Sequence, residues 1–455
     1  MHPWIVKEIA FPFHEKLLKR PTLKYANDLE KTQWLSREEI EILQRKKLKQ
    51  LLQLAVEHTP WHAKRILDAG LDLHRETLPD FKDLARLPTM TKQDAQLNGT
   101  QMVWQDVPGG AYQYTTGGSS GHALTFYFGK WRQASDAAGR IRARRWWGID
   151  IGDKEIYLWG APVELAKTDR IKHFRDRLMN QVLLNAFDMS PSTMKQYLET
   201  IRQYRPKCLY GYASSLALLA RFAQSTGQTI NIPELKAIFT TGEPLYPDQR
   251  EIIQEIFHAP VANEFGSRDI GFTAHESPTG QMLLMSESIV LELLDTEGQP
   301  VPVGATGEAV ITGLCSQAQP FIRYRTGDMV KATDQTCRQG RGLHVLGEVL
   351  GRSTDFVIKQ DGTILHALAV IYVLRAIEGV ESFKIIQHTT SELEVQIVQN
   401  ALWQEHYRAQ IIEQLQQRLG QIDIAVNKLD AIPPEKSGKH RYVVSHVPLP
   451  TDFQL

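Results

Sequence analysis

Apolar residues at helical spacing dominate the first part of the chain. Ser36 and Glu39 have the separation of a capping box, and apolar positions at helical intervals follow them up to Ala55. Thr59-Pro60 predicts the end of this helix, because the residue before a proline avoids the helical region. We expect residues 1–105 to be mainly helical.

Residues 1–20 carry an apolar pattern that charged side chains interrupt. Its apolar positions are Ile5, Val6, Ile9, Phe13 and Leu17. The interruptions, among them Lys7 and Glu8, argue against a signal peptide. No run in the chain approaches the roughly 18 apolar residues that cross a bilayer, so stable membrane insertion is not expected. The spacing suits a membrane surface or docking against the protein's own core, and we expect the second.

Short β-rich runs alternate with helical patterns between residues 106 and 351. The runs are Glu155–Trp159, Cys208–Tyr210, Ala237–Thr240 and Val261–Glu264, and the helical patterns are Ser214–Gln224 and Pro247–Phe257. This alternation predicts parallel sheets covered by helices. Turns rich in Gly and Pro indicate antiparallel strands at Ser288–Leu294 and Gly307–Thr312.

After Gly351 the pattern restarts as a small α+β unit. Its expected strands are Phe356–Ile358, Ser382–His388 and Glu392–Val398, and its expected helix is His406–Leu419. We predict an α/β protein with a large multi-sheet N-terminal domain over residues 1–351, helical in 1–105 and α/β in 106–351. A small mobile α+β lid is expected over residues 352–455.

The formal charges balance, with 52 basic and 52 acidic side chains. Such a chain lacks the field that holds a polyanion, so nucleic acid is not expected as a partner. The three cysteines form no CxxC pair and no metal-ligand spacing; they are Cys208, Cys315 and Cys337. We expect them to be core residues in a reducing compartment, which predicts a cytoplasmic protein.

Four arginines are crowded into one predicted helix, at Arg140, Arg142, Arg144 and Arg145. Such a run would attract phosphate groups or form a solvated helix face. We expect the solvated face.

A loop rich in Gly, Ser and Thr is the first segment that suggests chemistry. It contains Thr115, Thr116, Gly117, Gly118, Ser119, Ser120 and Gly121. Glycines let backbone N–H groups turn toward an anion, and hydroxyls add donors, so the loop suits a polyphosphate. Because His122 and Ala123 follow in place of the Walker lysine and hydroxyl, an ordinary P-loop is disfavoured.

This loop and the segments after it resemble the ANL superfamily of acyl-CoA synthetases, adenylation domains and luciferases. Within the superfamily the chain resembles the phenylacetate–CoA ligases and their capsule-biosynthesis relatives. The later segments, in the family's order, are Thr241-Gly242-Glu243, Phe265-Gly266-Ser267-Arg268-Asp269, Tyr324-Arg325-Thr326-Gly327-Asp328, Gly351-Arg352-Ser353-Thr354-Asp355 and Ser437-Gly438-Lys439.

The resemblance implies a binding site for ATP. The loop over residues 115–121 would hold phosphate, and the segment of Gly242, Glu243 and Pro244 would lie along adenosine. Phe265, where the family has tyrosine, would stack on adenine, with Gly266 and Ser267 beside it. Asp328 would accept hydrogen bonds from both ribose hydroxyls, and Arg352 would contact ribose or phosphate.

The resemblance also implies the catalytic groups. Asp269, where the family has glutamate, would help to bind Mg²⁺ and phosphate, and its shorter side chain puts direct metal contact in question. Lys439 would be delivered by the lid to bridge the substrate carboxylate and the α-phosphate. Asp355 marks the hinge at which the lid reorients.

The implied reaction converts a small carboxylic acid into its acyl-AMP and then transfers the acyl group, in this family usually to CoA. The acid pocket is expected beside Tyr210, Gly211, Tyr212 and Ala213, where the tyrosines suggest an apolar or aromatic acid or else serve as plain packing. Transfer to an amine, a hydroxyl or a carrier-protein thiol remains open, as does a catalytically silent nucleotide-binding module. No zinc is expected, and a homodimer is compatible with the resemblance.

Overall fold

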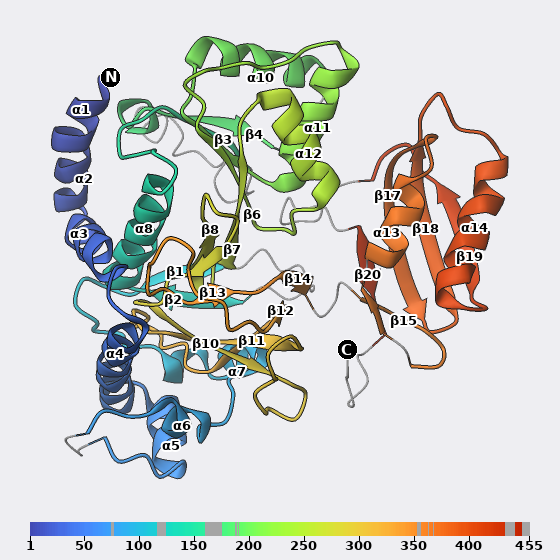
Figure 1. The fold of residues 1–455 in the computed structure, drawn as a ribbon. Coiled ribbons are helices and arrows are strands. Elements are labelled where there is room, and N and C mark those ends of the chain that lie inside the picture. The colour runs from blue at the N-terminus through green and yellow to red at the C-terminus, as the bar shows by residue number, and fades with distance from the viewer. Residues whose placement is uncertain are drawn as a thin grey trace.

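The architecture comes from a computed structural model. It describes residues 1–73, 77–115, 124–159, 175–186, 189, 191–352, 356–362, 364–366, 368–432 and 442–447. Figure 1 shows a large body and a smaller C-terminal domain at its side, as the sequence predicted. In the described ranges, no helix is both long and apolar enough to cross a membrane.

The N-terminal part of the chain is helical, as expected. Its helices are α1 (Pro3–Ile5), a π-helical segment (Val6–Ala10), α2 (Phe11–Leu17), α3 (Thr22–Thr32), α4 (Arg37–His58), α5 (Pro60–Asp68), α6 (Phe81–Ala85), α7 (Lys92–Leu97) and a 3₁₀ turn (Gly99–Met102). The predicted capping box opens α4, because the Glu39 N–H donates to the Ser36 hydroxyl at 3.2 Å and the Glu39 carboxylate accepts from the Ser36 N–H at 2.8 Å.

An eight-stranded sheet forms the centre of the body, in the order β13-β9-β8-β7-β6-β5-β3-β4. Its strands are β3 (Glu155–Trp159), β4 (Gln181–Asn185), β5 (Cys208–Gly211), β6 (Ala237–Thr241), β7 (Val261–Ser267), β8 (Gly271–Glu276), β9 (Met282–Leu284) and β13 (Val345–Leu346). Strands β3 to β7 run parallel, and β8, β9 and β13 continue the sheet antiparallel.

Helices cover both faces of this sheet. The helices α10 (Pro191–Tyr204), α11 (Ala213–Ser225) and α12 (Pro247–Phe257) enclose one apolar core with it, which includes Leu198, Leu219 and Phe257. On the other face lies α8 (Lys130–Arg145), whose residues contact β8. This layering places the carboxyl ends of β5, β6 and β7 at one edge, where α/β proteins commonly bind ligands.

A second sheet is antiparallel throughout, in the order β10-β11-β12-β14, as the Gly and Pro turns predicted. Its strands are β10 (Ile289–Leu294), β11 (Thr306–Gly313), β12 (Tyr324–Lys331) and β14 (Val349–Arg352). The hairpin of β1 (Tyr112–Thr115) and β2 (Thr125–Phe128) flanks the Gly/Ser/Thr-rich loop. Residues of both large sheets pack together around Phe265 and Val330.

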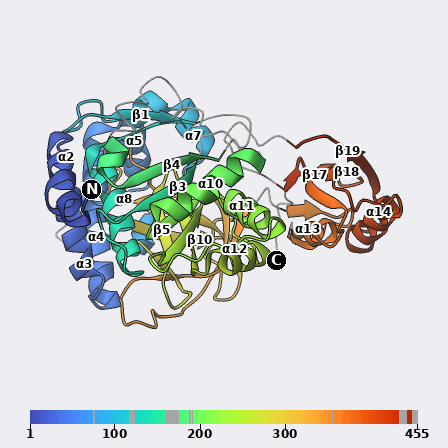
Figure 2. The ribbon, with the colours of Figure 1, turned by 90° about the horizontal axis from the view of Figure 1, so that it is seen from above.

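The C-terminal domain contains its own sheet, in the order β19-β18-β17-β20, and its own core. Its elements are β15 (Phe356–Ile358), β16 (Ile364–His366), α13 (Leu368–Arg375), β17 (Val380–Thr389), β18 (Glu392–Gln399), α14 (His406–Leu419), β19 (Asp423–Lys428) and β20 (Val443–Ser445). Figure 2 shows this domain beside the ends of α11 and α12. The division at residue 351 stays a prediction.

Two expectations from the sequence are wrong. Ile5, Ile9, Phe13 and Leu17 do not dock against the protein's core but are exposed, and only Val6 of that pattern is buried. The arginines of α8 do not form a solvated face. Each pairs with a carboxylate, and the two most buried pairs are Arg142 with Glu287 and Arg144 with Glu155. The hypothesis of core cysteines is confirmed, since all three are free and buried.

Candidate active site

Asp269 lies in the turn between β7 and β8, and its carboxylate is held by hydroxyl groups from two directions. The Ser267 hydroxyl donates to Oδ1, and the Tyr324 hydroxyl donates to Oδ2 at 2.9 Å. Tyr324 opens β12 of the second sheet, so this contact joins the two motifs that the sequence resemblance brought together. A carboxylate has about four lone-pair sites, so acceptor capacity remains for a cation or a phosphate-bound water.

Arg132 of α8 holds the main chain of the same turn. Its guanidinium donates to the carbonyl of Arg268 at 2.7 Å and to the carbonyl of Asp269. It also lies over the rings of Phe126 and Phe128, at 5.8 and 5.2 Å from their centroids. Since both rings are on β2, directly after the predicted phosphate loop, Arg132 connects that hairpin with the Asp269 turn.

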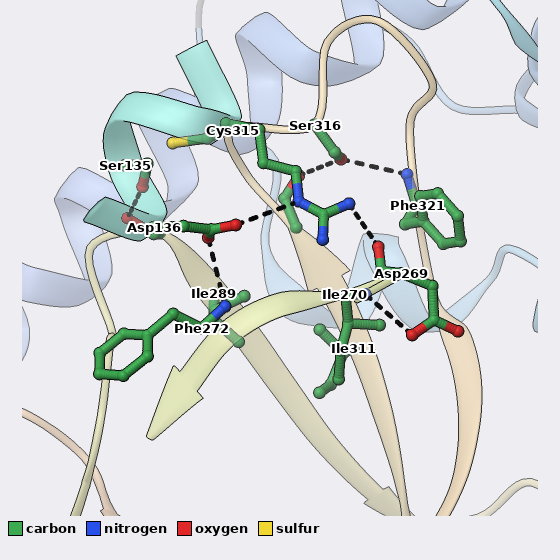
Figure 3. A pocket seen from close by; sticks show the side chains of 13 residues that line it. Ser135, Asp136, Asp269, Ile270, Phe272, Ile289, Ile311, Cys315, Ser316 and Phe321 are labelled. Carbon is green, nitrogen blue, oxygen red and sulfur yellow. Dashed lines mark hydrogen bonds and ion pairs between the residues drawn. The ribbon is translucent and has the colours of Figure 1, made fainter. Parts of the chain in front are cut away.

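A small cavity lies behind this turn (Figure 3). The Arg132 guanidinium pairs with the Asp136 carboxylate at 3.6 Å and donates to the main-chain carbonyl of Asp269. The cavity has room for little more than one water molecule, which excludes a nucleotide. Its other walls include Ser135, Ile270, Phe272, Cys315 and Phe321. We therefore interpret it as a small void bordered by Asp269 and place the nucleotide outside it.

Asp328 lies on β12, opposite Arg352 of β14 in the strand register. The chain reaches it through Gly327, whose φ of 76° favours glycine. Glu308 of β11 supports this bend, because its carboxylate accepts from the Gly327 N–H at 3.0 Å and from Arg325 Nε at 2.7 Å. The arrangement brings Asp328 and Arg352 to adjacent strands, and their roles toward ribose and phosphate stay predictions.

The Gly242-Glu243 segment follows β6 and meets the start of α11. Gly242 has a φ of 81°, and the Glu243 carboxylate accepts from the Ser214 N–H in the first turn of α11. An acidic side chain at a helix N-terminus satisfies a backbone donor and the helix dipole. Glu243 thereby ties the predicted adenosine segment to the predicted acid site at Tyr212.

The expected acid site contains a buried polar network centred on Glu264. Its carboxylate accepts from the Tyr210 hydroxyl at 2.9 Å and from the Thr241 hydroxyl at 3.3 Å, and it pairs with Arg140 at 3.3 Å. The Tyr210 hydroxyl is therefore committed to the protein. Tyr212 instead stacks on Trp159, with ring centroids 4.2 Å apart.

The charges of this network are mutually compensated. Burial raises the pKa of Glu264, but the charge of Arg140 and the hydrogen bonds to the carboxylate outweigh that effect, so the pKa lies below its usual value. Neighbouring His275 is neutral, because burial lowers its pKa to about 4 despite the opposing charge of Glu264. The expected acid site therefore has aromatic side chains beside a Glu264–Arg140 ion pair whose charges cancel.

Several predicted residues occupy packing positions or lie outside the described residues. Phe265 is buried against Ala309, Val330 and Leu346, and its role in stacking on adenine stays a prediction. Gly211 and Ala213 are buried in the strand-to-helix turn. Of Thr115 and Arg352 only the main chain is described, and the residues outside are Thr116–Gly121, Asp355 and Lys439.

Sequence reasoning missed Arg132, Glu264 and Glu308, each of which positions a predicted residue. Arg132 is 137 positions from Asp269, and Glu308 is 19 positions from Gly327. Glu264 directly precedes Phe265 and was named only as the end of a strand. No local spacing signals any of these contacts, because each partner comes from a different element.

Known proteins similar to this chain agree with the family resemblance inferred from its motifs. Residues 357–446 match the CapK C-terminal domain family. The chain is 21% identical to protein CapK of Staphylococcus aureus, covering 80% of this chain and 81% of CapK. It is 24% identical to phenylacetate-coenzyme A ligase of Thermus thermophilus, covering 80% and 82%. A 2-hydroxyisobutyryl-CoA ligase structure with 2-HIB-AMP matches with a TM-score of 0.71, 20% identity and 90% coverage of both chains.

These findings show the ANL-type fold and support an adenylating ligase as the class of protein. Within that class its homologues are CapK and the phenylacetate–CoA ligases, and it carries the CapK type of C-terminal domain. The resemblance inferred from the motifs is confirmed. The roles of individual site residues stay predictions.

Proposed function

We propose that the chain uses ATP to convert a small carboxylic acid into its acyl-AMP and then transfers the acyl group to CoA as a thioester. The observation that supports this most directly is the 2.9 Å hydrogen bond from Tyr324 to Asp269. It joins the turn proposed for Mg²⁺ and phosphate to the strand that carries Asp328, proposed for ribose. The named ligases among the relatives support CoA as the acceptor.

Magnesium fits the donors around Asp269. Hard cations prefer carboxylate oxygens, and Mg²⁺ usually keeps several waters and binds through one or two carboxylates plus substrate phosphates. In the part of the chain that the structure describes, no three His, Cys, Asp or Glu side chains gather into a ready-made cage. When bound, Mg²⁺ would neutralise phosphate charge beside Asp269.

The chain's own residues would act mainly by positioning and by charge. Asp328 would hold the ribose, and Arg132 would keep the Asp269 turn at a constant distance from the phosphates. The substrate carboxylate attacks the α-phosphorus, the bond to the bridging oxygen breaks, and pyrophosphate leaves. Lys439 would neutralise the negative charge that develops in this step. The CoA thiol, on losing its proton, then attacks the acyl carbon and AMP leaves.

The test is acid-dependent pyrophosphate release over aryl, fatty, hydroxy and amino acids, each with and without CoA. CoA-dependent AMP release with one class of acid is the expected result. Release of AMP only with an amine, a hydroxyl compound or a carrier protein would assign a different acceptor. Absence of pyrophosphate release across the whole panel would leave a silent nucleotide-binding module and refute the proposal.

Two variants test the assigned roles. Lys439→Ala should nearly abolish adenylation while ATP binding stays almost intact, and Lys428→Ala on β19 serves as the matched lysine control. Asp328→Asn should raise the KM for ATP roughly 10- to 100-fold, because a hydrogen bond to a charged group contributes about 1.5–3 kcal/mol. Its control is Asp295→Asn, which alters a surface-turn aspartate. Equal loss of ATP binding and chemistry in Lys439→Ala would contradict its role.

A further inference from the structure

The outward face of the first helical segment carries a stripe of large apolar side chains. Trp4, Ile9, Phe13 and Leu17 are 59%, 54%, 63% and 65% exposed. We call these residues, with Ile5 between the first two, the N-terminal stripe. Isolated exposed apolar residues are normal on a protein surface, but a contiguous row of them marks an interaction site. We propose that the N-terminal stripe docks this protein onto an anionic lipid surface.

The continuity of the stripe depends on the π-helical segment Val6–Ala10. In an α-helix, residues four apart lie on one face, which aligns Ile9, Phe13 and Leu17. Trp4 and Ile9 are five apart, and the i→i+5 bonding of a π-helix aligns them in the same way. The local change of helix type therefore extends one apolar row from Trp4 to Leu17.

The opposite face of this segment already has its partners in the body. Val6 is buried and packs near Gly152, and Lys7 pairs with Asp150 at 2.9 Å. The main chain of Met1 exchanges two hydrogen bonds with the Asn180 side chain, at 2.8 and 2.9 Å. The helix is therefore held in one orientation, and its apolar row faces away from the protein. Docking on the body cannot cover the row without breaking these contacts.

The charges beside the row favour an anionic surface. Lys16, Lys19 and Lys24 are exposed at its C-terminal end. Residues 1–24 hold two carboxylates: Glu15 is buried and paired with Arg20, and Glu8 is exposed, so the exposed lysines outnumber the exposed carboxylates. A helix with Trp, Phe and Leu on one face and lysines beside it lies in the plane of a lipid interface, and each lysine near an anionic surface adds to the affinity.

The geometry favours lipid over a second copy of the chain. A row one side chain wide along Pro3–Leu17 is roughly 22 Å long at 1.5 Å per residue. That is too narrow for the roughly 800 Å² that each partner buries in a stable protein interface. Figures 1 and 2 place α1 and α2 at the edge of the body far from the C-terminal domain. Lipid contact there leaves the lid unobstructed.

The test is co-sedimentation of the full chain with vesicles of phosphatidylcholine alone and of phosphatidylcholine mixed with phosphatidylglycerol. The wild type should bind the mixed vesicles, and added salt should weaken the binding. Ile9→Gln/Phe13→Gln should weaken it about tenfold or more. Lys16→Gln/Lys19→Gln should weaken binding to the mixed vesicles roughly tenfold. Leu67→Gln/Leu97→Gln, which alters two equally exposed apolar residues elsewhere, should bind like the wild type.

Two outcomes would overturn the proposal. One is equal sedimentation of the wild type and Ile9→Gln/Phe13→Gln, whether both bind or neither does. The other is a concentration-dependent dimer, measured by light scattering, that Ile9→Gln/Phe13→Gln abolishes, since a second copy would then cover the stripe. Thermal unfolding of each variant verifies folding. Because the experiment measures vesicle binding and not ligase activity, its outcome tests the lipid-docking proposal independently of the proposed function.

Discussion

His62 illustrates how a single buried side chain couples the stability of this protein to pH. Its Nε2 lies 2.9 Å from the carbonyl of Pro320, and its ring is fully buried beside Arg65. Burial, together with the charge of Arg65, lowers the pKa of His62 to about 3. The hydrogen bond to Pro320 opposes this shift but does not cancel it. His62 is therefore neutral in the folded chain and is protonated more easily when the chain unfolds.

A histidine with a lowered folded pKa makes stability fall as the pH falls below its unfolded value of about 6.5. Between about pH 6.5 and pH 3 the unfolded chain binds the extra proton, so acid favours unfolding. At pH 5 we expect His62 alone to cost about 2 kcal/mol relative to pH 7. The difference between the unfolding midpoints at pH 7 and pH 5 should therefore be smaller in His62→Gln. An unchanged difference would contradict the assignment, and His388→Gln, at an exposed position, is the control.

At the scale of elements, α8 organises the body through charges that are removed from water. Arg142 and Glu287 are both fully buried, with Nη1 and Oε1 2.5 Å apart, and Thr32 of α3 donates to the same carboxylate at 2.8 Å. A buried pair gains little net stability, because desolvation offsets the attraction. It does penalise any arrangement that separates the two charges, so we interpret it as fixing the position of α8 against α3.

Removing one member of this pair should lower the stability of the protein far more than replacing both members with apolar residues. Arg142→Met leaves Glu287 buried without its counterion and should destabilise the protein by about 3–5 kcal/mol. Arg142→Met/Glu287→Met should recover most of that loss, because packing replaces two desolvated charges. Urea denaturation of both variants measures the difference. If the double variant is no more stable than the single one, the charges themselves stabilise the fold.

At the scale of the whole molecule, an aromatic contact joins the body to the C-terminal domain. Tyr246, the N-cap of α12, is buried in the core of the C-terminal domain, and its ring lies edge-on to Tyr442 at 6.0 Å. Tyr442 in turn packs against Phe383 of β17, at 5.1 Å. Since Tyr246 follows the Gly242-Glu243 segment, the contact links the proposed nucleotide site to the C-terminal domain.

Tyr246→Ala should loosen the arrangement of the two domains. An aromatic pair is worth about 0.5–1.5 kcal/mol beyond its buried area, which shifts a two-state population by up to roughly tenfold. Small-angle scattering should then give a larger radius of gyration than in the wild type. Tyr407→Ala, which removes an aromatic ring from within the C-terminal domain, should leave it unchanged. Equal radii for Tyr246→Ala and the wild type would show that other contacts set the arrangement.

The sequence by itself determined many of the elements and the family resemblance. Apolar spacing located α4, α12 and α14, and the ordered motifs indicated the resemblance to adenylate-forming enzymes, because helix periods and loop residues are local properties. Only the tertiary structure decided which distant groups meet. In it the α8 arginines pair with carboxylates, the Tyr324 hydroxyl donates to Asp269, and the N-terminal stripe is exposed. These outcomes depend on how elements pack, and no local pattern of residues encodes them.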